Sequence, residues 1–233
     1  RGKNIPLGTI TADLSKLHAP AQYKLVVSLR AGDAMVENDW PFWLYPEHSA
    51  TPANPSSEIL ITNSWPEAEG RLARGGKVLF TPDPSTLGPD NPRLSTVPIF
   101  WNRLMNPRGA WMLGLLVDHI HPALAGFPSE ANCDWQWVDL LPNTHAINLD
   151  ALPPALDPIV QPIDDWNRNY KFGMLYECRA GKGKLMVCAF DLTSTRPGAP
   201  SLRRSILDYM TSAKFRPSVA IPIADLHSQW LNP

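Results

Sequence analysis

The sequence predicts an α/β fold in which a mainly parallel sheet carries helices on both faces, with a small antiparallel β segment at the N-terminal end. Two apolar runs, 172–178 and 184–190, flank a glycine-containing break at 180–183 and predict a β-hairpin, because glycine adopts positive φ without strain. A polar loop and an amphipathic helical stretch at 201–210 follow the hairpin. Earlier in the chain, a strand, a helix and a strand succeed one another over 58–81, which predicts a parallel pair joined by a crossover.

The second run of the hairpin is apolar at nearly every position and stops at Asp191, as expected for a strand that is covered on both faces. In the helix that follows, Leu202, Ile206 and Met210 recur at helical spacing, and Ser201 is the expected N-cap. Ligands of open α/β sheets bind beside the carboxyl ends of the strands. The sequence therefore indicates one place for a ligand, at the carboxyl end of this central strand.

Residues 1–46 predict strands, with candidate runs at 5–14, 23–29 and 40–45 and a turn at 31–33. Three or four strands are too few for a stable free-standing sandwich. The segment is therefore expected to be the end of a β-sandwich that begins upstream, or a sheet that packs on the residues that follow. Because residue 1 is Arg rather than Met, we expect a processed chain or an excised fragment.

A connector rich in Pro, Ala and Ser at 47–57 marks the expected boundary to an α/β domain at 58–215. The tail at 216–233 is expected to lie extended along the surface, since its prolines forbid a long helix. Within the domain, further strands are expected at 111–118, 146–152 and 158–164, and a short helix or an irregular edge at 133–141.

Composition argues against several classes of protein. The formal net charge is −1 and charged residues make up 18% of the chain, so no basic surface for nucleic acid is indicated. The apolar runs are strand-sized, far shorter than the roughly 20 residues of a membrane-spanning helix. No phosphate-binding loop or dinucleotide fingerprint is present, and His119 and His121 lack the further ligands of a metal site. We therefore expect no nucleic acid, membrane, metal or cofactor.

The chain has three cysteines, so at least one thiol is unpaired within it. Cys178 and Cys188 lie on the two runs of the hairpin, where a shift of one residue in the turn decides whether they share a face. Buried free thiols are the favoured interpretation, and a disulfide between these two is the alternative. None of the cysteines, Cys133 included, lies on the glycine-flanked elbow of a nucleophile, which disfavours a Cys hydrolase.

Five segments follow one another in a characteristic order, namely NDWPFWLYP, GGKVLFTP, HPALAGFPSEANCDWQW, PIVQPIDDW and GKGKLMVCAFDL. Through these segments, residues 24–210 resemble the C-terminal part of large bacterial glycoside hydrolase family 2 proteins, which are β-galactosidase-like enzymes often labelled sugar-binding-domain proteins. The α/β part is also similar to the class I glutamine amidotransferase-like fold, a flavodoxin-like arrangement.

The resemblance implies that residues 1–46 end an immunoglobulin-like sandwich, in a periplasmic or extracellular bacterial enzyme acting on β-galactosides or plant polysaccharides. Catalysis in that family uses two Glu on a (β/α)₈ barrel of about 250 residues, for which this chain has no room. We therefore expect a non-catalytic accessory region whose partners are upstream domains of the parent enzyme or a second copy. A stand-alone sugar-binding module and a small self-contained glycosidase are the alternatives.

The docking expectation rests on an aromatic strand. Trp40, Phe42, Trp43 and Tyr45 alternate along it, so aromatic side chains project from both of its faces. One face can cover the α/β domain, whereas the other lacks a partner among so few strands. Large exposed apolar patches are rare on soluble monomers, so this face is expected to dock.

Two sets of residues are candidates for carbohydrate chemistry. A glycosidase needs one carboxyl group as acid and a second as base or nucleophile, and carboxylates at predicted strand ends could supply them. Trp faces beside polar groups suit stacking on a sugar, although an aromatic seam between domains explains them as well. The candidate catalytic residues are Glu130, Asp134, Asp164, Asp165 and Asp191. The candidate sugar-contacting residues are Asp134, Trp135, Trp137, Asp165, Trp166 and Arg168.

Overall fold

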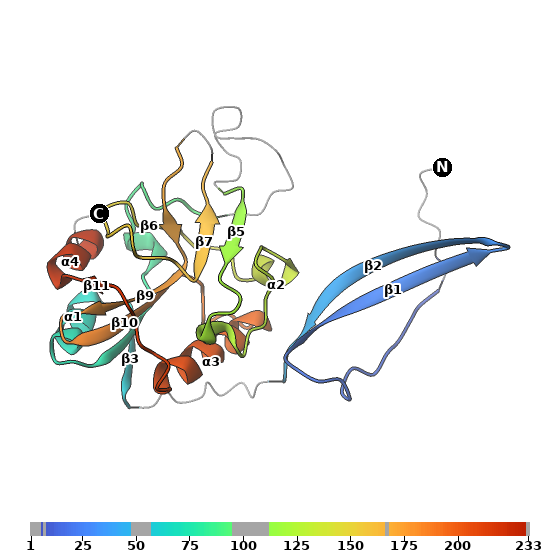
Figure 1. The fold of residues 1–233 in the computed structure, drawn as a ribbon, viewed down its shortest axis with the longest axis horizontal. Coiled ribbons are helices and arrows are strands. Elements are labelled where there is room, and N and C mark those ends of the chain that lie inside the picture. The colour runs from blue at the N-terminus through green and yellow to red at the C-terminus, as the bar shows by residue number, and fades with distance from the viewer. Residues whose placement is uncertain (1–5, 7, 48–56, 95–111, 166–167, 232–233) are drawn as a thin grey trace.

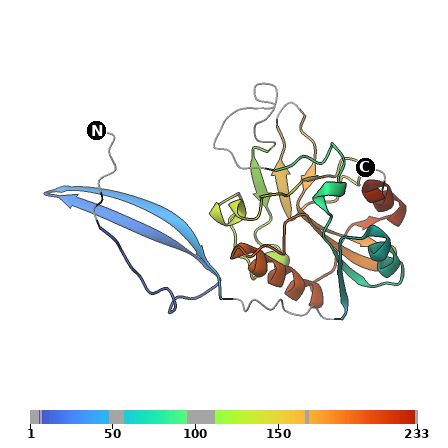
Figure 2. The same cartoon turned by 180° about the vertical axis from the view of Figure 1, so that it is seen from behind.

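The computed structural model describes residues 6, 8–47, 57–94, 112–165 and 168–231. A two-stranded antiparallel ribbon precedes a domain built on a seven-stranded mixed sheet. The ribbon projects away from that domain (Figure 1, and from behind in Figure 2).

The ribbon consists of β1 (Ala21–Ala31) and β2 (Ala34–Leu44), which pair in register along their whole length. Gly32 occupies the turn between them with φ of 62°, which confirms the predicted turn. The strand expected at 5–14 is wrong for the part of that run that the structure describes, since residues 6 and 8–14 belong to no strand. Pro6 and Gly8, both poor strand residues, explain the difference.

The larger sheet places strands from distant parts of the chain side by side. A separate small sheet joins β6 (Ile147–Asn148) to β8 (Phe172–Gly173). In order across the larger sheet, the strands are β3 (Ile59–Thr62), β4 (Lys77–Phe80), β10 (Gly183–Cys188), β9 (Leu175–Ala180), β7 (Val160–Ile163) and β5 (Gly114–Val117), with β11 (Ala220–Ile221) on the far end of β9.

The predicted fold class, a mainly parallel sheet with helices on both faces, is wrong, and so is its flavodoxin-like or amidotransferase-like form. β3, β4 and β10 pair in parallel, but β10–β9, β9–β7 and β7–β5 are antiparallel, and the chain has more strand than helix. The predicted hairpin is confirmed, and its turn at Gly181 and Lys182 is the cause, because so short a turn joins only antiparallel strands. Between β5 and β7 the chain forms only two short helices, η2 (Pro122–Leu124) and α2 (Trp135–Val138).

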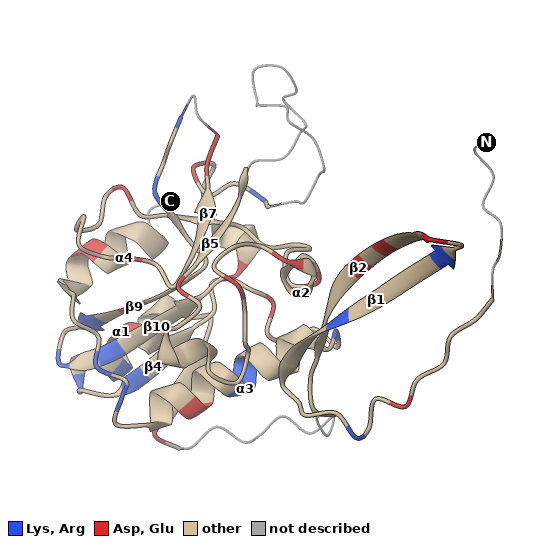
Figure 3. Cartoon of the chain, turned by 45° about the vertical axis from the view of Figure 1, so that its right-hand side comes forward, with Lys and Arg blue, Asp and Glu red and all other residues tan. Residues whose placement is uncertain are grey.

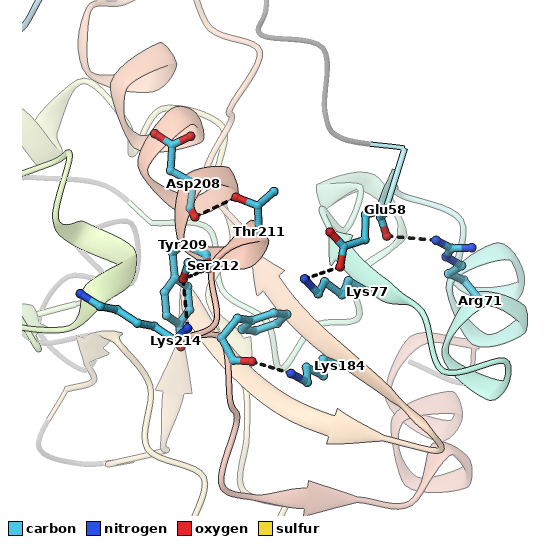
Figure 4. Close-up of polar contacts among 10 residues, drawn as sticks. Glu58, Arg71, Lys77, Lys184, Asp208, Tyr209, Thr211, Ser212 and Lys214 are labelled. Carbon is cyan, nitrogen blue, oxygen red and sulfur yellow. Dashed lines mark hydrogen bonds and ion pairs between the residues drawn. The ribbon is translucent and has the colours of Figure 1, made fainter.

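Helix α1 (Trp65–Ala73) covers one face of the parallel part of the sheet. The neighbours of Gly183 and Lys184, two adjacent residues of β10 that face opposite ways, show which face this is. A Cβ at Gly183 would lie 2.9 Å from the Cα of Leu72, so α1 lies directly against this face. Lys184 points to the opposite face, where its Nζ donates to the carbonyl of Phe215 over 2.7 Å (Figure 4). Phe215 comes just after α3 (Gly198–Thr211).

Polar contacts tie α1 to the edge of the sheet. Lys77 pairs with the Glu58 carboxylate over 2.6 Å, and Arg71 donates to the Glu58 carbonyl over 3.0 Å (Figure 4). The predicted strand, helix and strand of 58–81 are therefore confirmed as β3, α1 and β4 with parallel pairing.

Two expectations for the C-terminal part are wrong. Ser201 is not the N-cap of α3, which begins at Gly198 after Pro197, and Ser201 is buried within the helix. The tail is not extended throughout, because β11 and α4 (Ile223–Leu231) form within it. Pro222 stands just before α4 and its carbonyl accepts from the Asp225 N–H, so this proline starts a helix rather than preventing one.

Cys178 and Cys188 lie on opposite faces of the hairpin, since Cys178 is opposite Leu185 and Cys188 is opposite Leu175. Both thiols are fully buried and free, which confirms the favoured interpretation. Burial raises the pKa of each thiol to about 12.

Candidate functional site

The base of the ribbon is fastened to α2. The Trp43 indole Nε1 donates to Asp134 Oδ2 over 2.8 Å, and the Tyr45 hydroxyl donates to Gln136 Oε1. The Tyr45 ring also stacks on Phe127 with 5.3 Å between ring centroids. Burial, followed by the charge of Asp134, raises the pKa of Tyr45 well above its ordinary value, so its hydroxyl stays a donor.

Asp134 accepts hydrogen bonds from both α2 and the ribbon. It is the N-cap of α2, where its Oδ1 accepts from the Trp135 N–H over 2.7 Å. Its second oxygen receives the Trp43 indole. Burial, followed by the charge of Asp134, also raises the pKa of the neighbouring Cys133 thiol.

One face of the ribbon is apolar along most of its length. The register sets Leu25 opposite Trp40 and Leu29 opposite Val36, so these four side chains project from the same face. They are exposed to 45% and 46%, and to 63% and 68%, respectively. Besides alanines, the other apolar members of this face are Tyr23, Val27, Phe42 and Leu44.

The opposite face of the ribbon is largely polar. Lys24 pairs with Asp39 over 3.1 Å, and Ser28 donates to Glu37 over 2.8 Å. Basic side chains lie on β1 and acidic ones on β2 (Figure 3). Trp43 belongs to this polar face. The ribbon therefore contacts α2 through its polar face and not through its apolar face.

The structure brings together only some of the predicted sugar-contacting residues. Asp134 and Trp135 are neighbours at the ribbon base, and the Trp135 side chain is 69% exposed. Trp137 is fully buried: its Nε1 donates to Ser129 Oγ over 2.9 Å and its ring packs between Phe127 and Phe190, which leaves no face for a sugar.

Asp164 and Arg168 form a structural ion pair. Two guanidinium nitrogens of Arg168 donate to the Asp164 carboxylate over 2.8 and 2.6 Å, and the Tyr170 N–H adds a third hydrogen bond. Burial opposes ionisation of Asp164, but these hydrogen bonds outweigh it and lower its pKa. Asp165 is buried beside the pair, and its carbonyl accepts from the Asn169 N–H. Trp166 lies outside the described residues.

The candidate catalytic carboxylates are divided among three loops. Glu130 and Asp134 precede α2, and Asp164 and Asp165 follow β7. Asp191, which follows β10, lines a cleft.

That cleft has a volume of about 430 Å³ and lies at the carboxyl ends of the parallel strands β3, β4 and β10, where the sequence indicated a place for a ligand. Asp83 after β4 and Arg203 on α3 line it together with Asp191. Sequence reasoning missed Asp83 and Arg203. Asp83 could have been found from a pattern that it shares with Asp191, because each is followed two residues later by Ser or Thr just after a buried strand.

Among the described residues, no group of three or more His, Cys, Asp or Glu side chains is arranged to hold a metal ion. None of the described helices is both long and apolar enough to cross a bilayer.

Comparison with known proteins divides the chain into two parts. A family model described as a domain of unknown function, DUF8487, matches residues 60–230. A second model of the same description, DUF8488, matches residues 1–46, which include the whole ribbon. A search of curated proteins returned no match.

Proposed function

We propose a non-catalytic assembly role for this chain, which belongs to the DUF8487 family of domains of unknown function. The ribbon docks its apolar face on a second β-sheet and so completes a β-sandwich, while its polar face keeps the α/β domain at a fixed position beside that sandwich. The resemblance of five ordered segments to family 2 glycoside hydrolases supports a β-galactosidase-like parent enzyme and its upstream domains as the source of the second sheet.

The observation that carries the proposal is the exposed apolar face defined by Leu25, Leu29, Val36 and Trp40. Two-stranded ribbons are marginally stable alone, and sandwiches bury the apolar face of each sheet against the other. Alternation of apolar and polar side chains is the pattern of a sheet with one buried and one solvated face. The ribbon largely follows this pattern but, in the described chain, nothing covers the exposed side chains of Leu25, Leu29, Val36 and Trp40.

A second candidate role, contact with carbohydrate, rests on Trp135. Its indole is largely exposed beside the Asp134 carboxylate, which suits a ring that stacks on a sugar while a neighbour bonds hydroxyls. Quenching of Trp fluorescence by an oligosaccharide, lost in Trp135→Ala, would support this role. Turnover of nitrophenyl glycosides would instead indicate a self-contained glycosidase.

The assembly role is tested by sedimentation of the purified chain over a concentration series, alone and mixed with the upstream domains of its parent. The variant Leu29→Gln/Val36→Gln changes the apolar face. The matched control, Val26→Gln/Met35→Gln, changes two apolar residues on the polar face of the same strands. Association that is lost in the first variant and kept in the second supports docking. A wild-type chain that stays monomeric at about 100 μM and binds no upstream domain refutes it, because typical specific complexes form well below that concentration.

A further inference from the structure

The cleft at the carboxyl ends of β3, β4 and β10 has a floor and a rim of different chemistry. Ile61 on β3 and Pro84 after β4 line the cleft and are partly exposed, so they supply apolar surface. Charged side chains rise from the loops and from α3 around it. An apolar floor with a few convergent polar groups is the usual character of a small-molecule site.

Two carboxylates that line the cleft are each held in place through one oxygen only. Asp83 Oδ1 accepts from the Ser85 N–H over 2.9 Å and from its hydroxyl over 2.7 Å. Asp191 Oδ1 accepts from the Thr193 N–H over 2.9 Å and from its hydroxyl over 2.6 Å. In the described part of the chain, Oδ2 of each carboxylate accepts no hydrogen bond. Since β4 and β10 are neighbours, both carboxylates line the same cleft.

The third charge comes from α3. Arg203 lines the cleft, and within the described residues it forms no ion pair with Asp83, Asp191 or another carboxylate. Its neighbour Arg204, by contrast, pairs with Asp208 along the helix over 3.9 Å. Among the described residues, the cleft therefore contains two carboxylates and one guanidinium that form no ion pair with one another.

We propose that this cleft binds a small zwitterion, a molecule with a primary amine, a carboxylate and an apolar body. The ammonium group bonds the carboxylates of Asp83 and Asp191, the ligand carboxylate bonds Arg203, and the apolar body lies against Ile61 and Pro84. Hydrogen bonds between ionised groups are stronger than those between neutral ones, so a ligand carrying both charges gains most from this rim. A simple anion would be repelled by the two carboxylates. A simple amine would leave Arg203 without a counter-charge. A neutral sugar would supply a counter-charge neither to the carboxylates nor to Arg203.

The test is titration calorimetry of the full chain with L-leucine, two analogues that each lack one of its charged groups, and a neutral sugar. L-Leucine carries both charges, isoamylamine lacks the carboxylate, 4-methylpentanoate lacks the amine, and glucose is neutral. We expect L-leucine to bind with a dissociation constant of about 1 mM or lower and the other three at least about tenfold more weakly. Equal binding of all four, tighter binding of glucose, or no binding of leucine at about 10 mM overturns the proposal.

Variants locate the binding. Arg203→Met and Asp191→Asn are each expected to weaken leucine binding about tenfold or more, since each removes one charged hydrogen bond. Arg204→Met, one residue along the same helix, is the matched control and should bind as the wild type does. Far-ultraviolet dichroism verifies that each variant is folded. Leucine binding that survives both cleft variants places the ligand elsewhere and refutes the site.

Discussion

The Trp43 indole and the Asp134 carboxylate are joined across 91 residues of sequence by a hydrogen bond of 2.8 Å. Because Asp134 also caps α2, this single bond connects the ribbon to a fixed point of the α/β domain. Trp43 lies on the polar face of the ribbon, so fastening that face leaves the apolar face directed away from α2.

Trp43→Phe keeps an aromatic ring at this position but removes the indole N–H. It is expected to lower the free energy of unfolding by about 1.5 kcal/mol, the usual contribution of a hydrogen bond to a charged group. Asp134→Ala should lower it by about 1 kcal/mol more, because the helix cap is lost as well. Urea unfolding measures both. Trp40→Phe, on the free face, is the control and should change stability little; equal effects of the two Trp variants would contradict the role of Trp43.

The ion pair of Asp164 and Arg168 gives a pH-dependent prediction. Its carboxylate has a lowered pKa in the folded state, so the stabilisation is present above the ordinary pKa of Asp and is lost as pH falls toward the folded value. Arg168→Met leaves Asp164 buried without its cation and should destabilise the protein by about 3 kcal/mol at pH 7. The difference from wild type should shrink as pH falls, because burial without the cation favours the protonated, uncharged form of Asp164 in the variant. A difference that is constant between pH 7 and pH 3 would contradict this account.

The cysteines are expected to differ in reactivity. Cys178 and Cys188 are fully buried and their pKa is raised to about 12 by burial, so neither should react with a disulfide reagent at pH 8 in the native state. Cys133 is half-buried and should react first. Counting released chromophore should give no more than one thiol in the native protein and all three in urea. Rapid reaction of two thiols without denaturant is the contrary result.

Gly183 tests the close approach of α1 to β10. An added Cβ would lie 2.5 Å from the Gly76 carbonyl oxygen, which is backbone and cannot rotate away. Gly183→Ala is therefore expected to destabilise the fold by about 3 kcal/mol through overpacking. Gly32→Ala, in the open turn of the ribbon with φ of 62°, should lower stability by only about 1 kcal/mol. Urea unfolding of the two variants compares these effects, and the reverse order would contradict the packing described.

Local patterns predicted local structure well. The hairpin turn at Gly181, the strand and helix positions of 58–81, and helix α3 all follow from glycine placement and from periodicity within short windows. Strand direction did not follow, because the partners of β9 and β7 are set by contacts between segments that are distant in sequence. The prolines of the tail do not prevent a helix, since Pro222 stands before α4 rather than inside it.

In the candidate sites, too, the features set by local sequence patterns could be predicted and those set by tertiary contacts could not. The exposed apolar face of the ribbon could be predicted, because alternation along the strand puts Trp40 and Phe42 on one face and Trp43 on the other. The cleft could be placed at the end of β10, but its charged rim could not, because Asp83 and Arg203 meet Asp191 only through the pairing of β4 with β10 and the packing of α3. The buried state of Trp137 and the ion pair of Asp164 likewise depend on tertiary contacts.

The most direct test of the central claim measures whether the apolar face of the ribbon is covered when the chain is assembled with the upstream domains of its parent. Cysteines are placed at Leu29 on the apolar face and, in a second variant, at Met35 on the polar face, two positions of similar exposure, 63% and 59%. Maleimide labelling is read at each position by peptide mass spectrometry. The account predicts fast labelling at both positions in the isolated chain, and protection at position 29 but not at position 35 after assembly. Equal labelling at the two positions in the assembled protein would contradict it.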